Sequence, residues 1–124
     1  MSAYTIKNIT DVENAAAKHG RPGEARFVRE ALGCEQNAFS YQRVEPNGRS
    51  LAHRHSDHEE LYFILSGSGR VKLDDDIRDV GRFDIVRVAP TVVRQFEAGP
   101  DGLELIAIGD KGFDQAEIVE DFWP

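Results

Sequence analysis

Apolar residues recur along this chain in short runs separated by turn-forming residues. Glu35–Val44, Leu61–Leu65 and Leu103–Ile108 are three of these runs, and their β-branched and aromatic residues favour strands. Groups such as Pro46-Asn47-Gly48 and Ala89-Pro90-Thr91 stand between the runs and predict turns. Seven or eight short strands at spacings of about 8–12 residues indicate an all-β sandwich or barrel. Such a barrel can hold one small ligand in its interior.

The first third of the chain has weaker patterns. Tyr4–Ile9 alternates enough for a short strand, and Asp11–His19 predicts a helix of one or two turns capped at Thr10 or Asp11. Ala25–Leu32 fits a helix or a strand, and Gly33 ends either one. We therefore expect one domain with an N-terminal arm packed on the barrel (residues 1–35), a barrel core (36–109) and a C-terminal tail (110–124).

Composition narrows the class of protein. With 124 residues, 40% of them hydrophobic and 30% charged, the chain is typical of one globular domain. A net charge of −7 argues against a nucleic-acid partner, and no apolar run is long enough to span a membrane. A single cysteine, Cys34, cannot form an internal disulfide, so a cytoplasmic location is expected.

Candidate chemistry is concentrated at the start of the Leu61–Leu65 run. His53 and His55 are two residues apart, so on a strand both point to one face. Glu60 opens the next strand, which Ser66-Gly67 ends with a turn. A hairpin formed by these two strands would bring two imidazoles and a carboxylate together, which is a ligand set for a divalent transition metal.

The face of each strand follows from alternation. Glu60, Tyr62 and Ile64 share the inner face, which leaves Leu61, Phe63 and Leu65 on the outer face. Large apolar side chains on an outer face need cover, which the N-terminal segment or a second subunit would supply.

This pattern resembles the first motif of the cupin superfamily: a glycine, His-x-His, a glutamate three or four residues later, and a glycine after six more. Gly48 precedes His53 and His55, and Glu60 is followed by six residues and Gly67. Gly48 stands one residue nearer to His53 than is usual. The resemblance covers residues 36–109 and implies a small single-domain cupin, a jelly-roll barrel with a metal site, and a homodimer.

Gly81–Phe96 resembles the second cupin motif but departs from it at one position. The family carries a histidine there as a fourth ligand, whereas this chain carries Arg94. Alternation places Arg94 on the inner face together with Val92, Phe96 and Ala98. Because arginine stays protonated, it cannot bind a metal ion.

Two functions are expected from this reduced ligand set. In the first, His53, His55 and Glu60 bind iron, manganese, zinc or nickel, and Arg94 grips a small anionic molecule. Tyr62 then lines the site as a donor or proton shuttle, and the enzyme is a dioxygenase, isomerase or decarboxylase. In the second, Glu60 and Arg94 pair directly, and the barrel is a metal-free binding or sensor module.

The other polar and aromatic residues of note are expected to have structural roles. His58 is expected to be an exposed turn residue. Alternatively, it folds inward and either supports the metal ligands or replaces one of them. Glu59 faces solvent or pairs with an arginine, and Asp74-Asp75-Asp76 forms an exposed acidic turn. Trp123 anchors the tail to the barrel.

Overall fold

The chain folds into an antiparallel β-structure with short helical turns near its N-terminus, and the computed structural model describes residues 3–110 and 116–124. The elements, in chain order, are η1 (Ile9–Asp11), α1 (Ala15–Lys18), β1 (Glu24–Phe27), α2 (Arg29–Leu32), β2 (Asn37–Val44), β3 (His53–His55), β4 (Glu60–Leu73), β5 (Asp76–Gly81), β6 (Ile85–Val88), β7 (Arg94–Asp110) and β8 (Ala116–Ile118). The predicted all-β barrel is confirmed. Among the helices of these ranges, none has the length and apolar character needed to cross a membrane.

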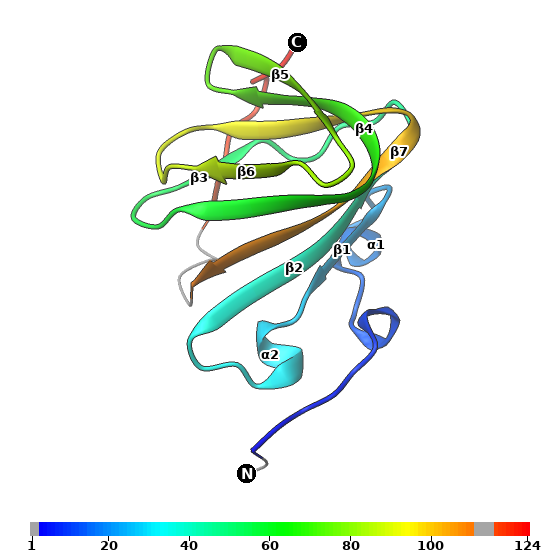
Figure 1. Ribbon diagram of the computed structural model, residues 1–124, viewed down its shortest axis with the longest axis vertical. Coiled ribbons are helices and arrows are strands. Elements are labelled where there is room, and N and C mark those ends of the chain that lie inside the picture. Colours follow the sequence, from blue (N-terminus) through cyan, green and yellow to red (C-terminus); the bar gives the residue numbers. More distant parts are fainter. Residues whose placement is uncertain (1–2, 111–115) are drawn as a thin grey trace.

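Two long strands organise the sheet. β4 pairs with β5, β6 and β7, while β7 also pairs with β2 and β3. Figure 1 shows both long strands bending, so that the sheet curls around its own inner face. The N-terminal segment joins this sheet through β1, which pairs with β2, and α1 packs beside β1. The division of the chain at residues 35 and 109 stays a prediction.

The inner face of the curled sheet forms the core. Tyr62 and Ile64 of β4 and Phe96 and Ala98 of β7 are all buried, as alternation predicted. Leu61, on the other face of β4, is 46% exposed. The other buried apolar residues of this cluster are Ala38, Val44, Val71, Val80, Val88, Leu103, Leu105 and Ala107.

The turn predicted at Ser66-Gly67 is wrong, because β4 continues through Gly67, and β7 likewise continues through Gly102. The strands change register between Ile64 and Ser66 and again between Gly67 and Gly69. Gly67 has φ 82° and Gly102 has φ 80°, and a Cβ on Gly67 would overlap the carbonyl oxygen of Gly102. Glycine at this crossing therefore lets two strands bend and approach closely, as at a β-bulge.

The predicted hairpin between the histidines and Glu60 is also wrong. β3 pairs with β7 through His53 and Arg94, and with β8 through His53 and Ile118, but not with β4. The turn at residues 56–59 instead carries the chain from β3 to a different part of the curled sheet. Glu60 therefore approaches the histidines across the interior of the barrel and not along a shared ladder.

The N-terminal predictions were partly wrong. Tyr4–Asn8 forms no strand, and α1 is a single turn capped by the side chain of Asn14, not by Thr10 or Asp11. Residues 25–32 contain both of the alternatives, the end of β1 and then α2, which ends at the left-handed Gly33.

The C-terminal tail docks on the barrel as predicted. Trp123 lies under the guanidinium groups of Arg49 and Arg70, whose carbons are 4.6 and 5.1 Å from the ring centre. Glu97 pairs with both arginines and so holds their guanidinium groups in position against the Trp123 ring. Asp74 and Asp75 form an exposed turn between β4 and β5, as expected, and the third aspartate, Asp76, is exposed as the first residue of β5.

We expect Gly67→Ala to lower the free energy of unfolding by about 2–4 kcal/mol, because the new methyl group meets backbone and the φ angle is left-handed. Gly81→Ala is the matched control, since nothing lies within 4 Å of a Cβ there and no positive φ is required. Urea unfolding of both variants measures the difference. Equal stabilities would contradict the close crossing.

Candidate metal centre and cavity

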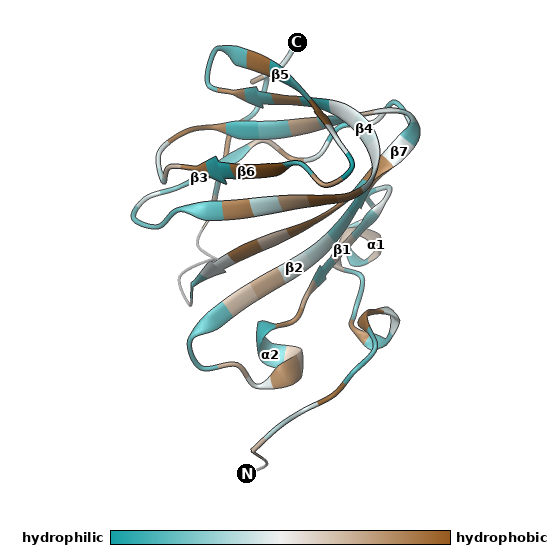
Figure 2. Ribbon diagram, viewed as in Figure 1, coloured by the Kyte–Doolittle hydropathy of each residue, from teal (hydrophilic) through white to brown (hydrophobic). Residues whose placement is uncertain are grey.

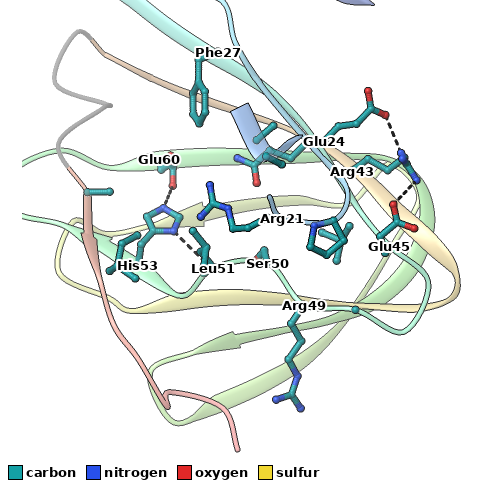
Figure 3. Close-up of a pocket in the computed structure, with 18 of the residues that line it drawn as sticks. Arg21, Glu24, Phe27, Arg43, Glu45, Arg49, Ser50, Leu51, His53 and Glu60 are labelled. Carbon is teal, nitrogen blue, oxygen red and sulfur yellow. Dashed lines mark hydrogen bonds and ion pairs between the residues drawn. The ribbon is translucent and has the colours of Figure 1, made fainter. Parts of the chain in front are cut away.

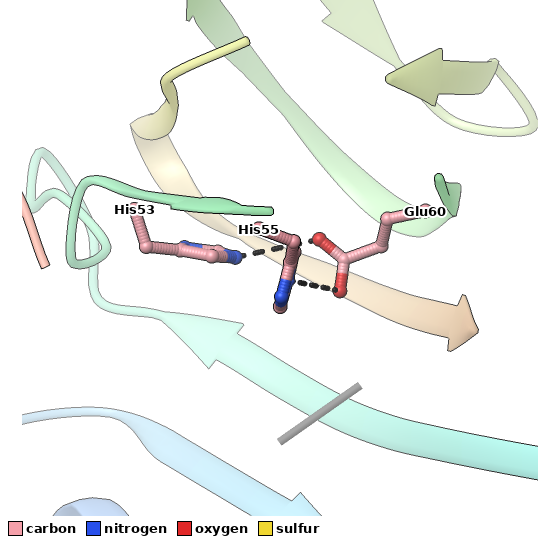
Figure 4. Close-up of side chains that lie close together, drawn as sticks. All are labelled: His53, His55 and Glu60. Carbon is pink, nitrogen blue, oxygen red and sulfur yellow. Dashed lines mark hydrogen bonds and ion pairs between the residues drawn. The ribbon is translucent and has the colours of Figure 1, made fainter. Parts of the chain in front are cut away.

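Two histidines and one glutamate converge inside the barrel. The Nε2 atom of His53 lies 3.4 Å from Oε1 of Glu60, and Nε2 of His55 lies 3.5 Å from Oε2. Figure 4 shows both imidazoles turned toward the carboxylate. Both rings point the same way because His53 and His55 alternate with Arg54 on β3, and Arg54 turns outward to pair with Glu117.

The Glu60 carboxylate is buried yet charged. Its side chain is 1% exposed, and burial alone would raise its pKa. Hydrogen bonds with His53, His55 and Tyr62 outweigh burial and lower the pKa of Glu60 to about 2. Burial and the Glu60 charge in turn raise the pKa of Tyr62, so the phenol keeps its proton and its O–H donates a hydrogen bond to the Glu60 carboxylate.

This group of residues fits a divalent metal ion. One ligand atom from each of His53, His55 and Glu60 can be chosen so that all lie within 4.8 Å of one another. Metal–ligand bonds of about 2.1 Å place neighbouring ligand atoms about 3.0–3.4 Å apart, close to the two imidazole–carboxylate distances. Two imidazoles and a carboxylate also match a known ligand set for iron, zinc and other transition metals.

Arg94 and Tyr62 lie against Glu60. Arg94 is 0% exposed, and its Nε is 3.8 Å from Oε1 of Glu60. Its Nη2 donates to the carbonyl oxygen of Ala89, while Nη1 is buried without a hydrogen-bond partner among the described residues. Neither Arg94 nor Tyr62 is among the residues that line the cavity described next. Their predicted roles toward a substrate stay predictions; their observed contact is with the carboxylate.

A cavity of about 450 Å³ leads to the three candidate ligands. Figure 3 shows its residues coming from two sides, with β1 and β2 on one and the segment through Leu51 and His53 on the other. Ala116 and Ile118 of β8 complete the second side. His53, with 19% of its side chain exposed, is the most accessible of the three candidate ligands.

Three arginines and three glutamates line this cavity, and the arginines differ in their partners. Arg43 is neutralised by Glu24 and Glu45, and Arg49 pairs with Glu97 outside the lining. Arg21 differs, because its guanidinium has no acidic partner within the ranges that the structure describes. Figure 3 shows Arg21 extending into the cavity toward His53 and Glu60.

His58 is buried, which corrects the prediction of an exposed turn residue. It is 8% exposed, its ring centre is 4.3 Å from that of His55, and its Nδ1 is 3.2 Å from Asp57. The turn folds the ring inward because it packs on His55. Glu59 behaves as expected and pairs with Arg87 at the surface.

The fold and the motif both have counterparts among known proteins. The model of a family described as Cupin domain matches residues 40–109, which is more than half of the chain. The chain belongs to the cupin family. Within this cupin, the matched region contains His53, His55, Glu60 and Arg94 but not Arg21 or the β1 and β8 walls of the cavity.

Solved structures agree with this assignment. A cupin protein from Bacteroides fragilis is 22% identical, with a TM-score of 0.73 over 92% of this chain and 89% of that one. The polyketide cyclase RemF from Streptomyces resistomycificus is 20% identical, with a TM-score of 0.75 over 93% and 84%. A deletion mutant of oxalate decarboxylase from Bacillus subtilis is 26% identical, with a TM-score of 0.75 over 94% of this cupin but 33% of that chain. Among curated proteins, none matches this chain.

Sequence reasoning missed the cavity residues outside the motif. The sequence pattern could have identified Leu51, because Leu51 alternates with His53 and His55 and so shares their face. Arg21 and Phe27 could not be found in this way, because no local pattern says which wall of the barrel the N-terminal segment of this cupin covers.

The buried charge of Glu60 should be required for stability in this cupin. Glu60→Gln leaves the buried Arg94 without its anion, so we expect a loss of about 3–5 kcal/mol in metal-free protein. Glu59→Gln, the adjacent control, removes an exposed ion pair and should change stability by less than about 1 kcal/mol. Urea unfolding with a chelator present measures both variants, and an unchanged Glu60→Gln protein would contradict the argument.

Proposed function

We propose that this cupin binds a divalent transition metal ion through His53, His55 and Glu60 and acts on a small anionic organic molecule in the adjoining cavity. The observation that carries the proposal is the convergence of three ligand atoms beside an accessible space. When bound, such a metal ion would supply Lewis-acid or oxygen chemistry of the kind used by dioxygenases, isomerases and decarboxylases. Iron, manganese, zinc and nickel all suit these ligands.

The protein's own residues have separate tasks in this proposal. Glu60 is held in its charged form by Tyr62 and the two imidazoles, so it is ready to bind a cation. Arg94 stands at the sequence position where the cupin family carries a histidine as a fourth ligand. Because arginine does not bind a metal ion, that coordination position is left for another ligand. Its buried Nη1, which lacks a hydrogen-bond partner among the described residues, suits an anionic oxygen between the guanidinium and the metal ion.

Charge in the cavity supports an anionic substrate. Arg21 points into the space from outside the barrel core and has no acidic partner in the described ranges. An acid group held between Arg21 and the metal ion would form favourable electrostatic contacts with both positive charges. The likeness to oxalate decarboxylase, at 26% identity, is in keeping with an organic acid, although this chain spans only a third of that protein.

A second candidate function rests on the ion pair between Arg94 and Glu60. Their 3.8 Å separation places a permanent cation next to the site, and this opposes a metal ion unless an anion is bound with it. In that case the barrel is a non-catalytic, metal-free module that binds or senses a small molecule. Metal content separates the two candidates.

We expect tag-free protein to bind about one divalent metal ion per chain, and the His53→Ala/His55→Ala double variant to lose it, because the variant keeps only the carboxylate. His19→Ala is the control, since His19 caps α1 and is neither one of the three candidate ligands nor a cavity-lining residue. Elemental analysis after metal loading and desalting measures the stoichiometry. No metal in the parent protein under any loading condition would favour the metal-free module.

Homodimer formation is the second part of the proposal. Leu61, Phe83, Ile85 and Ile108 are 39–78% exposed, and Leu61 pairs with Ile108 where β4 meets β7. Figure 2 shows hydrophobic residues on the neighbouring strands β4, β6 and β7. The helices α1 and α2 pack on β1 and β2, and this face stays exposed in the part of the chain that the structure describes. A second copy would bury it.

The location is proposed to be cytoplasmic, because Cys34 is a free thiol.

The dimer predicts a defined response to charge. Leu61→Lys/Ile85→Lys should convert a dimer into a monomer, because it places two cations in an apolar contact. Ile77→Lys is the control, since Ile77 is 43% exposed on β5, which pairs with the opposite half of β4. Light scattering at micromolar concentration gives the mass, and a monomeric parent protein would contradict the proposal.

A further inference from the structure

Three large apolar side chains remain exposed inside the cavity. Phe27 is 47%, Leu51 44% and Ile118 52% exposed, and each of them lines the same space as His53 and Glu60. They are distinct from the outer apolar face of β4 and β6, none of whose exposed residues lines this cavity. An apolar surface kept open next to polar groups is typical of a ligand site.

The positions of these side chains follow from strand alternation. Phe27 and Ala25 alternate with Arg26, which turns away to bond the backbone of the N-terminal segment. On the facing side, Leu51 precedes His53 by two residues, and Ile118 of β8 pairs directly with His53. Two strands from distant parts of the chain and the segment before β3 therefore direct apolar groups into one space. Val44 and Ala116 extend the same lining.

The size and the polar groups of the cavity limit what can fill it. Pockets of about 300–1,000 Å³ hold drug-sized ligands, and this cavity is about 450 Å³. A two-carbon acid would reach the metal centre but would leave Phe27, Leu51 and Ile118 in contact with water. An acid with an apolar body would cover them while its anionic group meets His53, Glu60 and Arg21. Figure 3 shows Arg21 extending toward His53 and Glu60.

We propose that the ligand is an organic acid whose apolar body, the size of one or two rings, packs against Phe27, Leu51 and Ile118. These three residues then determine specificity, and the acid group binds at the end of the cavity where His53, Glu60 and Arg21 meet. This inference rests on the proposed function and adds the class of substrate to it.

The test compares acids that carry the same charge. Calorimetry with 2-naphthoate, and competition by acetate against it, gives two affinities for the full chain, both metal-free and metal-loaded. We expect 2-naphthoate to bind at least about tenfold more tightly, because only it covers the apolar lining. Phe27→Ala should weaken 2-naphthoate binding about tenfold and leave acetate binding unchanged. Ile77→Ala is the control, since Ile77 is 43% exposed and lies outside both the cavity and the proposed dimer face.

Each outcome decides the inference. Equal affinity for the two acids, absence of 2-naphthoate binding, or an equal loss for both acids in Phe27→Ala would overturn it. If Phe27→Ala does not fold, Leu51→Ala and Ile118→Ala are judged by the same ratio of affinities. Protein that binds no metal but still prefers 2-naphthoate refutes the metal-dependent function alone. Protein that binds metal without this preference refutes only the apolar body.

Discussion

One buried negative charge holds the site together. Glu60 is fully enclosed, and an isolated carboxylate there would be far less stable than one in water. Its charge is kept by His53, His55 and Tyr62, with Arg94 close behind. These partners come from β3, β4 and β7, so the carboxylate joins parts of the sheet that do not share one ladder. The site and the closed barrel therefore depend on each other.

Alternation along curved strands gives the molecule three separate apolar surfaces. Residues on the inner face, such as Tyr62 and Ile64, form the core, and their neighbours on β4 form an outer face suited to a second copy. A further apolar surface lines the cavity, where Phe27 and Leu51 stay open to a ligand. The same backbone geometry thus places the core, the outer apolar face and the cavity lining on different faces.

Local patterns predicted the strands, their inner and outer residues and the three candidate ligands, because spacing of two residues sets the face of a strand. These patterns failed where contacts between residues far apart in the sequence determine the backbone conformation or the strand pairing. Gly67 looks like a turn residue, yet the approach of Gly102 makes it a bend within one strand. The partners of β3 could not be inferred, because β8 lies about sixty residues further along the chain. Arg21 and His58 acquire their surroundings only when the barrel closes.

We propose that His53, His55 and Glu60 bind one metal ion that faces the cavity. Anomalous diffraction from crystals of the zinc- or manganese-loaded protein tests it most directly. We expect a single strong peak about 2.0–2.2 Å from one atom of each of the three side chains. A peak elsewhere, or none in crystals grown with excess metal while Arg94 stays paired with Glu60, would contradict it.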